Sequence, residues 1–334
     1  MSENGTIPKR KMIFNWRGWL NTLSPVLALV IVFELFVLIA PSSFATTRNM
    51  ELIARQTAIV GVAALGMTLV IISGGIDLSV GSVVALGTVV IAWLLRYTGA
   101  SPLMAALGGV AASACFGFIS GILITRLRVV PFIVTLGMML VIRGAAKGIG
   151  REQKIDVDPD RLSWLEDLLA TVPKERSWML LPPGVWIMIF LAIGMAALLR
   201  YTRLGRHTFA IGSNEQTARL CGVAVERVKV LVYTLCGAFA GLAGLMQFSR
   251  LTVGDPTVAV GLELNVIAAV VIGGGSLSGG EGSILGTLVG ALIMTVIASG
   301  CTQRGYPNWV QEIITGAIIV IAVALDRLRH RRTA

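Results

Sequence analysis

Charged residues are scarce in this chain. Only 14% of its 334 residues are Asp, Glu, Lys or Arg, whereas a soluble domain carries about 25%. Hydrophobic residues make up 55%, and the mean hydropathy is +0.81. This composition excludes a water-soluble surface over most of the chain. Apolar runs of about 20 residues, long enough to cross a hydrocarbon core as helices, recur from end to end. The sequence predicts an all-α polytopic membrane protein.

Motifs for catalysis, metal binding and nucleotide binding are missing as well. The four cysteines show no CxxC spacing, and the two histidines, His207 and His330, cannot form a multi-histidine metal site. No GxxxxGK[ST], HExxH or GxSxG stretch occurs. The formal net charge of +10 is spread among apolar runs, and no basic, aromatic-rich soluble domain is present to bind DNA or RNA. We therefore expect no catalytic residues, no metal, no cofactor and no nucleic-acid partner.

Ten helices are predicted from the apolar runs. Gly-rich breaks separate the second helix from the third and the eighth from the ninth. Each break is either a tight turn at a membrane face or an unwound segment inside the protein, because irregular backbone exposed to lipid leaves polar groups unsatisfied. The predicted ranges are 22–41, 52–73, 78–97, 102–125, 129–147, 183–200, 228–250, 260–276, 283–300 and 309–326.

The distribution of Lys and Arg predicts the orientation. The N-terminal segment 1–21, the loop 201–227 and the tail 327–334 are basic, whereas acidic residues outnumber basic ones in the long loop 148–182. The positive-inside rule then places both termini in the cytoplasm and 148–182 in the periplasm. These segments flank or interrupt one transmembrane domain, residues 22–326.

Two stretches of the sequence resemble each other. "GGIDLSVGSVVALGTVV" (74–90) is similar to "GGGSLSGGEGSILGTLV" (273–289). This likeness indicates either an internal duplication, which is common in transporters, or two Gly-rich turns that are alike by chance.

A carboxylate stands in the first of these breaks. Gly74 and Gly75 suit the end of a helix, and Asp77, followed by Ser79, suits the positive end of the next one. A helix stop and a helix cap therefore account for the residue types, and a gate at the same place is compatible with them.

The inner loop contains a second notable segment, "SNEQTARLCGVAVERVK" (213–229). Ser213 and Asn214 are good N-cap residues, and Gly222 suits a helix end. The pattern predicts a cytoplasmic helix of about two turns, which either rests on lipid headgroups or docks into a partner protein.

Several segments resemble one family. "GMTLVIISGGIDLSVGSVVAL" (66–86), "VPFIVTLG" (130–137), "GRHTFAIGSNEQTARLCGVAVERVKVLVYTLCG" (205–237) and "LNVIAAVVIGGGSLSGGEGSILGTLVGALI" (264–293) are similar to permease subunits of ribose-type ABC importers. These include the ribose, xylose, arabinose, galactofuranose and autoinducer-2 permeases. The likeness runs from about Ile53 to Ala322, nearly the whole membrane part.

The resemblance implies an architecture and partners. The helices are expected to adopt the larger, vitamin-B12-importer-like (type II) arrangement. The permease would pair with a second permease, as a homodimer or a heterodimer, within membrane lipid. Separate ABC ATPase subunits, which bind ATP and Mg²⁺, would dock from the cytoplasm, and a periplasmic sugar-binding protein would deliver the ligand from outside. The loop 148–182 and the stretch 253–265 are the candidate contacts for that protein. The alternative is a solvated loop whose Trp164 and Trp178 lie at the membrane interface.

The resemblance also assigns roles to residues. The short inner helix resembles the coupling helix that contacts the ATPase, with Asn214, Glu215, Ala218, Arg219 and Gly222 at the matching positions. An inner-gate or packing role is assigned to the first Gly-rich break, at Gly74, Gly75, Asp77 and Ser79. Small or weakly polar residues are expected to line the pathway, namely Met67, Thr68, Asn265 and Ser276.

The function expected from these observations is that of an inner-membrane permease subunit of an ATP-driven importer for a small sugar or related polyol. The first alternative is an ion- or proton-coupled secondary transporter, which needs buried ionisable ligands along its pathway. The second is a membrane enzyme. Only the importer requires the inner loop to bind an ATPase.

Overall fold

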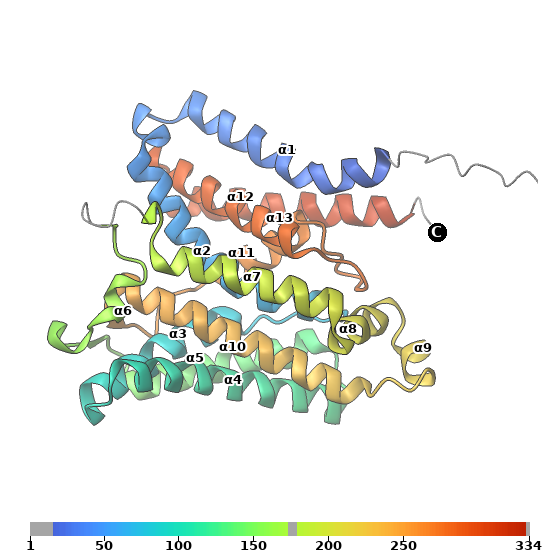
Figure 1. Cartoon of the computed structure of the whole chain (residues 1–334), viewed down its shortest axis with the longest axis horizontal. Coiled ribbons are helices and arrows are strands. Elements are labelled where there is room, and N and C mark those ends of the chain that lie inside the picture. Colours follow the sequence, from blue (N-terminus) through green and yellow to red (C-terminus); the bar gives the residue numbers. More distant parts are fainter. Residues whose placement is uncertain (1–15, 173–178, 332–334) are drawn as a thin grey trace, which may run out of the picture.

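Apolar segments fold into helices in a membrane because a helix satisfies the backbone polar groups within the segment itself. The computed structural model describes residues 16–172 and 179–331, and a helix occupies each of the ten predicted ranges. Most of these helices run roughly along one common direction (Figure 1). They are α1 (Trp16–Ile39), α2 (Thr47–Ile72), α3 (Val80–Trp93, continued by the π-helical turn Leu94–Thr98), α4 (Pro102–Leu127), α5 (Pro131–Gly150), α7 (Pro183–Tyr201), α10 (Val225–Leu251), α11 (Leu262–Ile272), α12 (Ile284–Gln303) and α13 (Asn308–Arg331).

Not all ten helices are long enough to span a membrane. Within the described residues, seven helices are long and apolar enough to cross a membrane, namely α2, α3 with its π-helical turn, α4, α5, α7, α10 and α12. The helix α11 has only 11 residues, which at 1.5 Å per residue is about 16 Å, or half of the hydrocarbon thickness. The predicted range 260–276 is therefore too long. Which of the ten helices cross the membrane stays a prediction, and so does the B12-importer-like arrangement.

The helix α2 lies at the centre of the bundle. Its residues Thr57–Ile72 are buried without interruption, and it packs against α7, α10, α11 and α12. The pair of helices with the most extensive contact, α4 and α10, meets through small residues. A Cβ added at Gly117 would lie 3.0 Å from the Cα of Gly237, so glycine at both positions lets the two backbones approach, as is common between membrane helices.

The two ends of the bundle are built differently. At one end, the loop after α5 forms β1 (Ile155–Asp156), which pairs antiparallel with β2 (Val253–Gly254). The loop continues through the 3-10 turn Pro159–Arg161 and α6 (Trp164–Asp167). At the other end lie α8 (Arg203–Ser213) and α9 (Glu215–Leu220), on the right of Figure 1. The sequence analysis did not anticipate the strand pairing.

Candidate functional site at the glycine breaks and the inner loop

The first Gly-rich break ends α2 by hydrogen bonds that only a left-handed residue permits. Gly74 has φ +79°, and its N–H donates to the carbonyl of Ile71 at 2.9 Å. The N–H of Gly75 reaches back to the carbonyl of Val70, also at 2.9 Å. This pair of bonds is the Schellman ending of a helix, and glycine adopts its left-handed step without strain. The predicted helix stop is confirmed.

The carboxylate of Asp77 organises the turn that follows. It is 2% exposed, and its Oδ1 accepts hydrogen bonds from the N–H of Ser79 at 2.8 Å and from the hydroxyl of Ser79 at 2.6 Å. Ser79, not Asp77, is the N-cap residue of α3. Asp77 therefore fixes the turn before the helix instead of capping the helix directly, which corrects the sequence-based prediction.

The second Gly-rich break repeats this local geometry. Gly274 has φ +92°, and its N–H donates to the carbonyl of Val271 at 3.0 Å, while Gly275 donates to Val270 at 2.8 Å. The buried Ser276 then takes the place of the aspartate, since its hydroxyl oxygen accepts from the N–H of Ser278 at 3.2 Å. Ser276 directly follows Gly275, whereas Ile76 separates Gly75 from Asp77, and the second break as a whole (273–283) is longer than the first (73–79). The two breaks are thus alike locally, and the duplication of longer segments stays a prediction.

The two breaks meet each other and the end of α8. The N–H of Gly280 donates to the carbonyl of Ile72, the last residue of α2, at 2.9 Å. A Cβ added at Gly212 of α8 would overlap that carbonyl oxygen and lie 2.5 Å from the nitrogen of Gly280. One added at Gly279 would lie 2.9 Å from the Cα of Gly74. We call Gly74, Gly212, Gly279 and Gly280 the glycine junction.

The sequence analysis did not find Gly212, although it directly precedes the predicted N-cap pair. A single glycine inside "FAIGSN" carries no signal by itself, because its partners come from two other loops.

The short helix α9 follows the junction after two residues and is capped at both ends. Its N-cap is Asn214, whose side-chain oxygen accepts from the N–H of Thr217 at 2.9 Å. Gly222, with φ +84°, ends it through a hydrogen bond from its N–H to the carbonyl of Arg219 at 3.0 Å. A two-turn helix is marginal alone, and these caps stabilise it. Of the two predicted cap residues, the structure selects Asn214 over Ser213.

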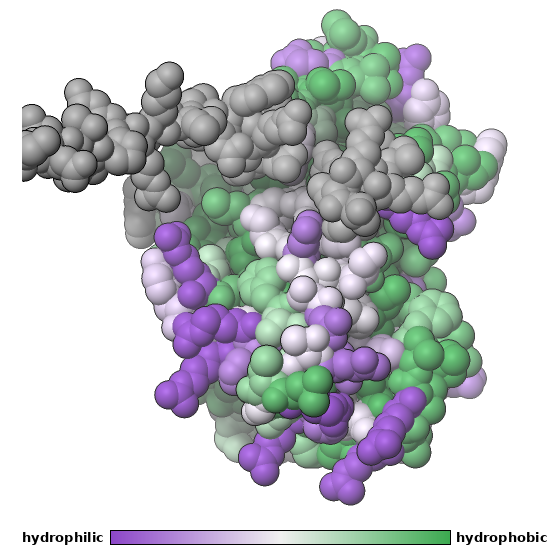
Figure 2. Space-filling model, turned by 90° about the vertical axis from the view of Figure 1, so that its right-hand side faces the viewer, coloured by the Kyte–Doolittle hydropathy of each residue, from purple (hydrophilic) through white to green (hydrophobic). Residues whose placement is uncertain are grey.

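Ion pairs tie α9 to the start of α10. Lys229 lies 2.6 Å from Glu215, and Arg219 bonds to Glu226 at 2.5 Å. Glu215 and Arg219 are engaged in these ion pairs, and Ala218 is buried. The apolar side chain of Leu220, in contrast, is 89% exposed. Figure 2 views this end of the molecule and shows hydrophilic residues around smaller apolar patches.

The remaining predicted residues lie in different surroundings. Met67 and Thr68 are fully buried in α2, and the hydroxyl of Thr68 lies 2.9 Å from that of Thr287 on α12. Asn265 is half-buried near the start of α11. The rest of this helix separates it in sequence from the second break. The structure thus brings the break residues together and the α9 residues together. Pathway and gate roles stay predictions.

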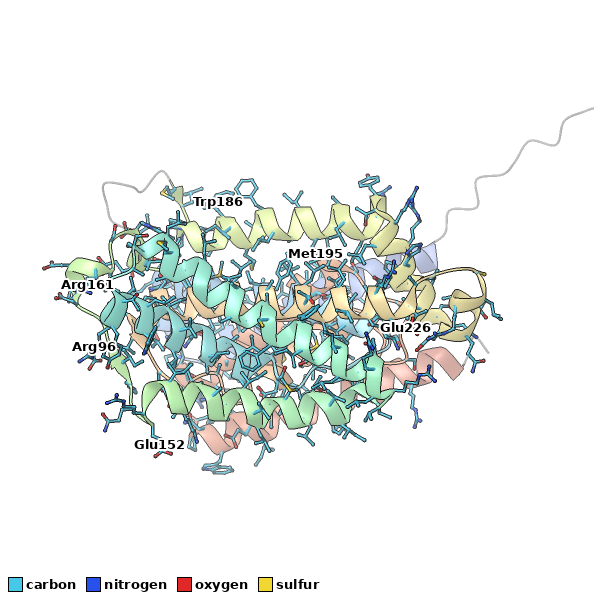
Figure 3. The ribbon with its side chains drawn as sticks, turned by 90° about the horizontal axis from the view of Figure 1, so that it is seen from below. Arg96, Glu152, Arg161, Trp186, Met195 and Glu226 are labelled. Carbon is cyan, nitrogen blue, oxygen red and sulfur yellow. The ribbon has the colours of Figure 1, made fainter. Side chains whose placement is uncertain are left out.

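At the opposite end, an arginine fixes the stretch that the sequence analysis assigned to partner contact. The guanidinium of Arg143 on α5 donates to the carbonyls of Pro256 at 2.9 Å and Val258 at 2.7 Å. These bonds hold the turn between β2 and α11 against the bundle. Arg96 and Arg161, labelled in Figure 3, fix the neighbouring loop through bonds to backbone carbonyls.

An ion pair strengthens the same turn. Asp255 accepts from the N–H and the hydroxyl of Thr257 and pairs with Lys154 at 3.1 Å. Burial alone raises the pKa of Asp255, but the bonds from Thr257 and the charge of Lys154 outweigh it and leave the pKa below its ordinary value of 3.8.

The fold and the bundle of apolar helices define a polytopic membrane protein, and comparisons with known proteins define its class. Residues 49–323 match the family described as the permease component of the branched-chain amino acid transport system. The ribose import permease protein of Escherichia coli strain K12 is 37% identical over 318 residues, which cover 94% of this chain and 96% of that protein.

Other relatives are similar over the same length. The L-arabinose ABC transporter permease protein of Azospirillum brasilense is 35% identical and covers 94% of this chain and 89% of its own. The fructose import permease protein of Rhizobium meliloti is 35% identical, with 91% and 84% covered. No solved structure matches the chain. The chain therefore belongs to the ABC-importer permease family that includes the ribose permeases.

Proposed function

We propose that this chain forms the membrane pathway of an ATP-driven, binding-protein-dependent importer for a small sugar, either a pentose, a hexose or a related polyol. The observation that carries this proposal is the likeness over at least 90% of the chain to permeases named for ribose, arabinose and fructose. The family description names branched-chain amino acids. We prefer a sugar because the three relatives described above, which align over at least 90% of the chain, carry sugar names.

The inner loop supports the ATP-driven part of the proposal. The helix α9 presents an exposed Leu220 on a short segment that two caps and two ion pairs hold in place. A secondary carrier has no need for such a segment. We propose that α9 contacts a separate ATPase subunit, which binds ATP and Mg²⁺, through residues that include the predicted coupling set of Asn214, Glu215, Ala218, Arg219 and Gly222.

The glycine junction supplies a route from α9 to the membrane helices. Gly212 lies two residues before Asn214 and touches the end of α2 and the loop before α12 through backbone atoms alone. Packed backbones are not compressible, so a displacement of α9 moves these ends. The contact at Gly74 supports a gate role for the first break, with Gly75, Asp77 and Ser79, in this proposal.

The other parts of the assembly follow from the family. Both termini and α9 lie in the cytoplasm, and the loop 148–182 faces a sugar-binding protein in the periplasm of the cell whose inner membrane holds the permease. A second permease, identical or related, completes the pathway. Residues 173–178 of that loop lie outside the described residues.

The test is a mild-detergent pull-down of the tagged chain from native membranes, with mass spectrometry of what co-purifies. We expect a P-loop ATPase with the wild type. Leu220→Asp places a charge on a side chain of α9 that is 89% exposed and should abolish the recovery. The matched control is Leu180→Asp, which makes the same change at an 80% exposed leucine in the outer loop and should leave the ATPase bound.

Two outcomes would contradict the proposal. A chain that purifies alone and transports its solute without ATP would establish the ion-coupled carrier instead. A co-purifying binding protein that takes up leucine or valine and no sugar would keep the importer but refute the substrate class.

A further inference from the structure

An apolar groove of about 370 Å³ runs between α7 and α12. It opens on the side of the bundle, and exposed Ile193 and Leu285 stand among its walls, while small residues such as Ala196 make room between them. Figure 3 shows α7 along one edge of the molecule, where its side chains reach outward.

One end of this groove is basic. Arg200 is the single charged side chain among the described residues that line the groove, and none of these residues is Asp or Glu. Its guanidinium lies 5.5 Å from the ring centroid of Tyr201. The chain then turns at Thr202 into α8, whose exposed Arg203 and Arg206 follow within one turn. Three arginines therefore gather where α7 ends and α8 begins, beside an apolar slot.

We infer that this groove binds an anionic phospholipid, with an acyl chain between α7 and α12 and the phosphate at Arg200. An apolar slot that opens toward the hydrocarbon and has a cation at one end matches the two halves of such a lipid. The surface of the membrane attracts basic residues to anionic headgroups, and Tyr next to Arg is typical of the headgroup region. The small sugar proposed as the substrate is polar and does not fit an apolar slot.

The inference does not depend on the transported substrate. It requires only that α7 crosses a membrane. In the orientation proposed above, the arginines lie at the cytoplasmic leaflet, where anionic lipids face the protein.

The test is native mass spectrometry of the full-length chain, first stripped of lipid in detergent. The chain is then titrated with phosphatidylglycerol or with phosphatidylcholine of the same acyl chains. Arg200→Gln removes the cation and should weaken phosphatidylglycerol binding about fivefold, the effect of one basic residue at a membrane surface, while phosphatidylcholine binding is unchanged. Ala196→Leu fills the groove and should reduce retention of both lipids.

The matched control is Arg126→Gln, which removes an exposed arginine at the same end of the molecule, on α4. It should bind phosphatidylglycerol like the wild type. Equal losses for Arg200→Gln and Arg126→Gln would overturn the inference, because they would show a general effect of charge. If Ala196→Leu instead leaves lipid retention intact and dissociates a dimer, the groove holds a second copy and the lipid assignment is wrong.

The readout is separate from the importer test. Lipid retention involves no ATPase or solute. A negative result in the lipid experiment therefore does not contradict the proposed function. Equally, a pull-down that recovers no ATPase does not contradict the lipid site. A variant that elutes as a single monodisperse species is folded well enough for either measurement, and Arg200→Gln changes an exposed side chain.

Discussion

Replacement of Gly212 by alanine tests the glycine junction most directly. The added methyl group would overlap the carbonyl oxygen of Ile72 and lie 2.5 Å from the nitrogen of Gly280. Both atoms belong to backbone, so neither can rotate away as a flexible side chain would. The 2.9 Å hydrogen bond between them must lengthen or break as the two segments separate.

The magnitude follows from three contributions. Overpacking of a tight interior costs about 1–3 kcal/mol. The loss of one net hydrogen bond adds about 0.5–1.5 kcal/mol. Alanine in place of glycine inside α8 stabilises the helix by about 1 kcal/mol, because alanine has the higher helix propensity. The folded chain should therefore lose about 0.5–3.5 kcal/mol of stability, and the contact between α8, α2 and the loop before α12 should loosen.

Two measurements on reconstituted importer check this prediction. The apparent melting temperature of Gly212→Ala should fall, and the number of ATP molecules hydrolysed per imported sugar should rise, because α9 then moves without carrying the ends of α2 and α12 with it. The matched control is Gly194→Ala in α7, where an added Cβ meets nothing within 4 Å. Equal melting temperatures and equal coupling ratios for the two variants would refute the reasoning.

Three further predictions test the other contacts. Asn214→Ala removes the N-cap of α9, should cost about 1 kcal/mol of local helix stability, and should weaken ATPase recovery in the pull-down without loss of chain expression. Asp255→Asn removes the ion pair with Lys154. Because the pKa of Asp255 is lowered in the folded chain, its stabilisation is present above pH 3.8 and is lost as the pH falls through the lowered value. The melting temperatures of wild type and variant should therefore differ at about pH 7 and converge as the medium becomes more acidic than the ordinary pKa; a constant gap would contradict this. A double-mutant cycle of Thr68→Val and Thr287→Val should give about 0.6 kcal/mol of coupling between α2 and α12, and a value near zero would show that the two hydroxyls bond only within their own helices.

Local structure was predictable from the sequence where a residue acts on its own neighbours. The ten apolar runs gave helices, Gly74 and Gly222 end helices as their type requires, and the inner loop holds a short capped helix. Each of these features depends on hydrogen bonds within about six residues, so composition and spacing carry the information.

Features that depend on distant segments were missed or misjudged. The eighth predicted span is the half-length α11 for two reasons: Gly274, with φ +92°, ends it after Ile272, and the turn before Leu262 is held by Arg143 of α5, a contact across more than 100 residues. The strand pair between the outer loop and β2 is equally non-local. Asp77 was predicted to cap α3 and instead holds the turn before it, because Ser79 takes the cap position.

The glycine junction explains why glycine is needed at places where local geometry alone does not demand it. Gly212 lies inside a helix, where alanine is preferred by about 1 kcal/mol, and its φ is not left-handed. The position is constrained by the backbone of α2 and of the loop before α12, which approach too closely for any side chain. Contact through backbone has a mechanical consequence, since no rotamer can absorb a displacement there. A push on α9 reaches Gly212 within two residues and must then move the end of α2 and the second break together, or break the bond from Gly280 to Ile72. An importer driven from its inner loop needs such a rigid link, whereas a carrier driven by an ion inside the bundle does not.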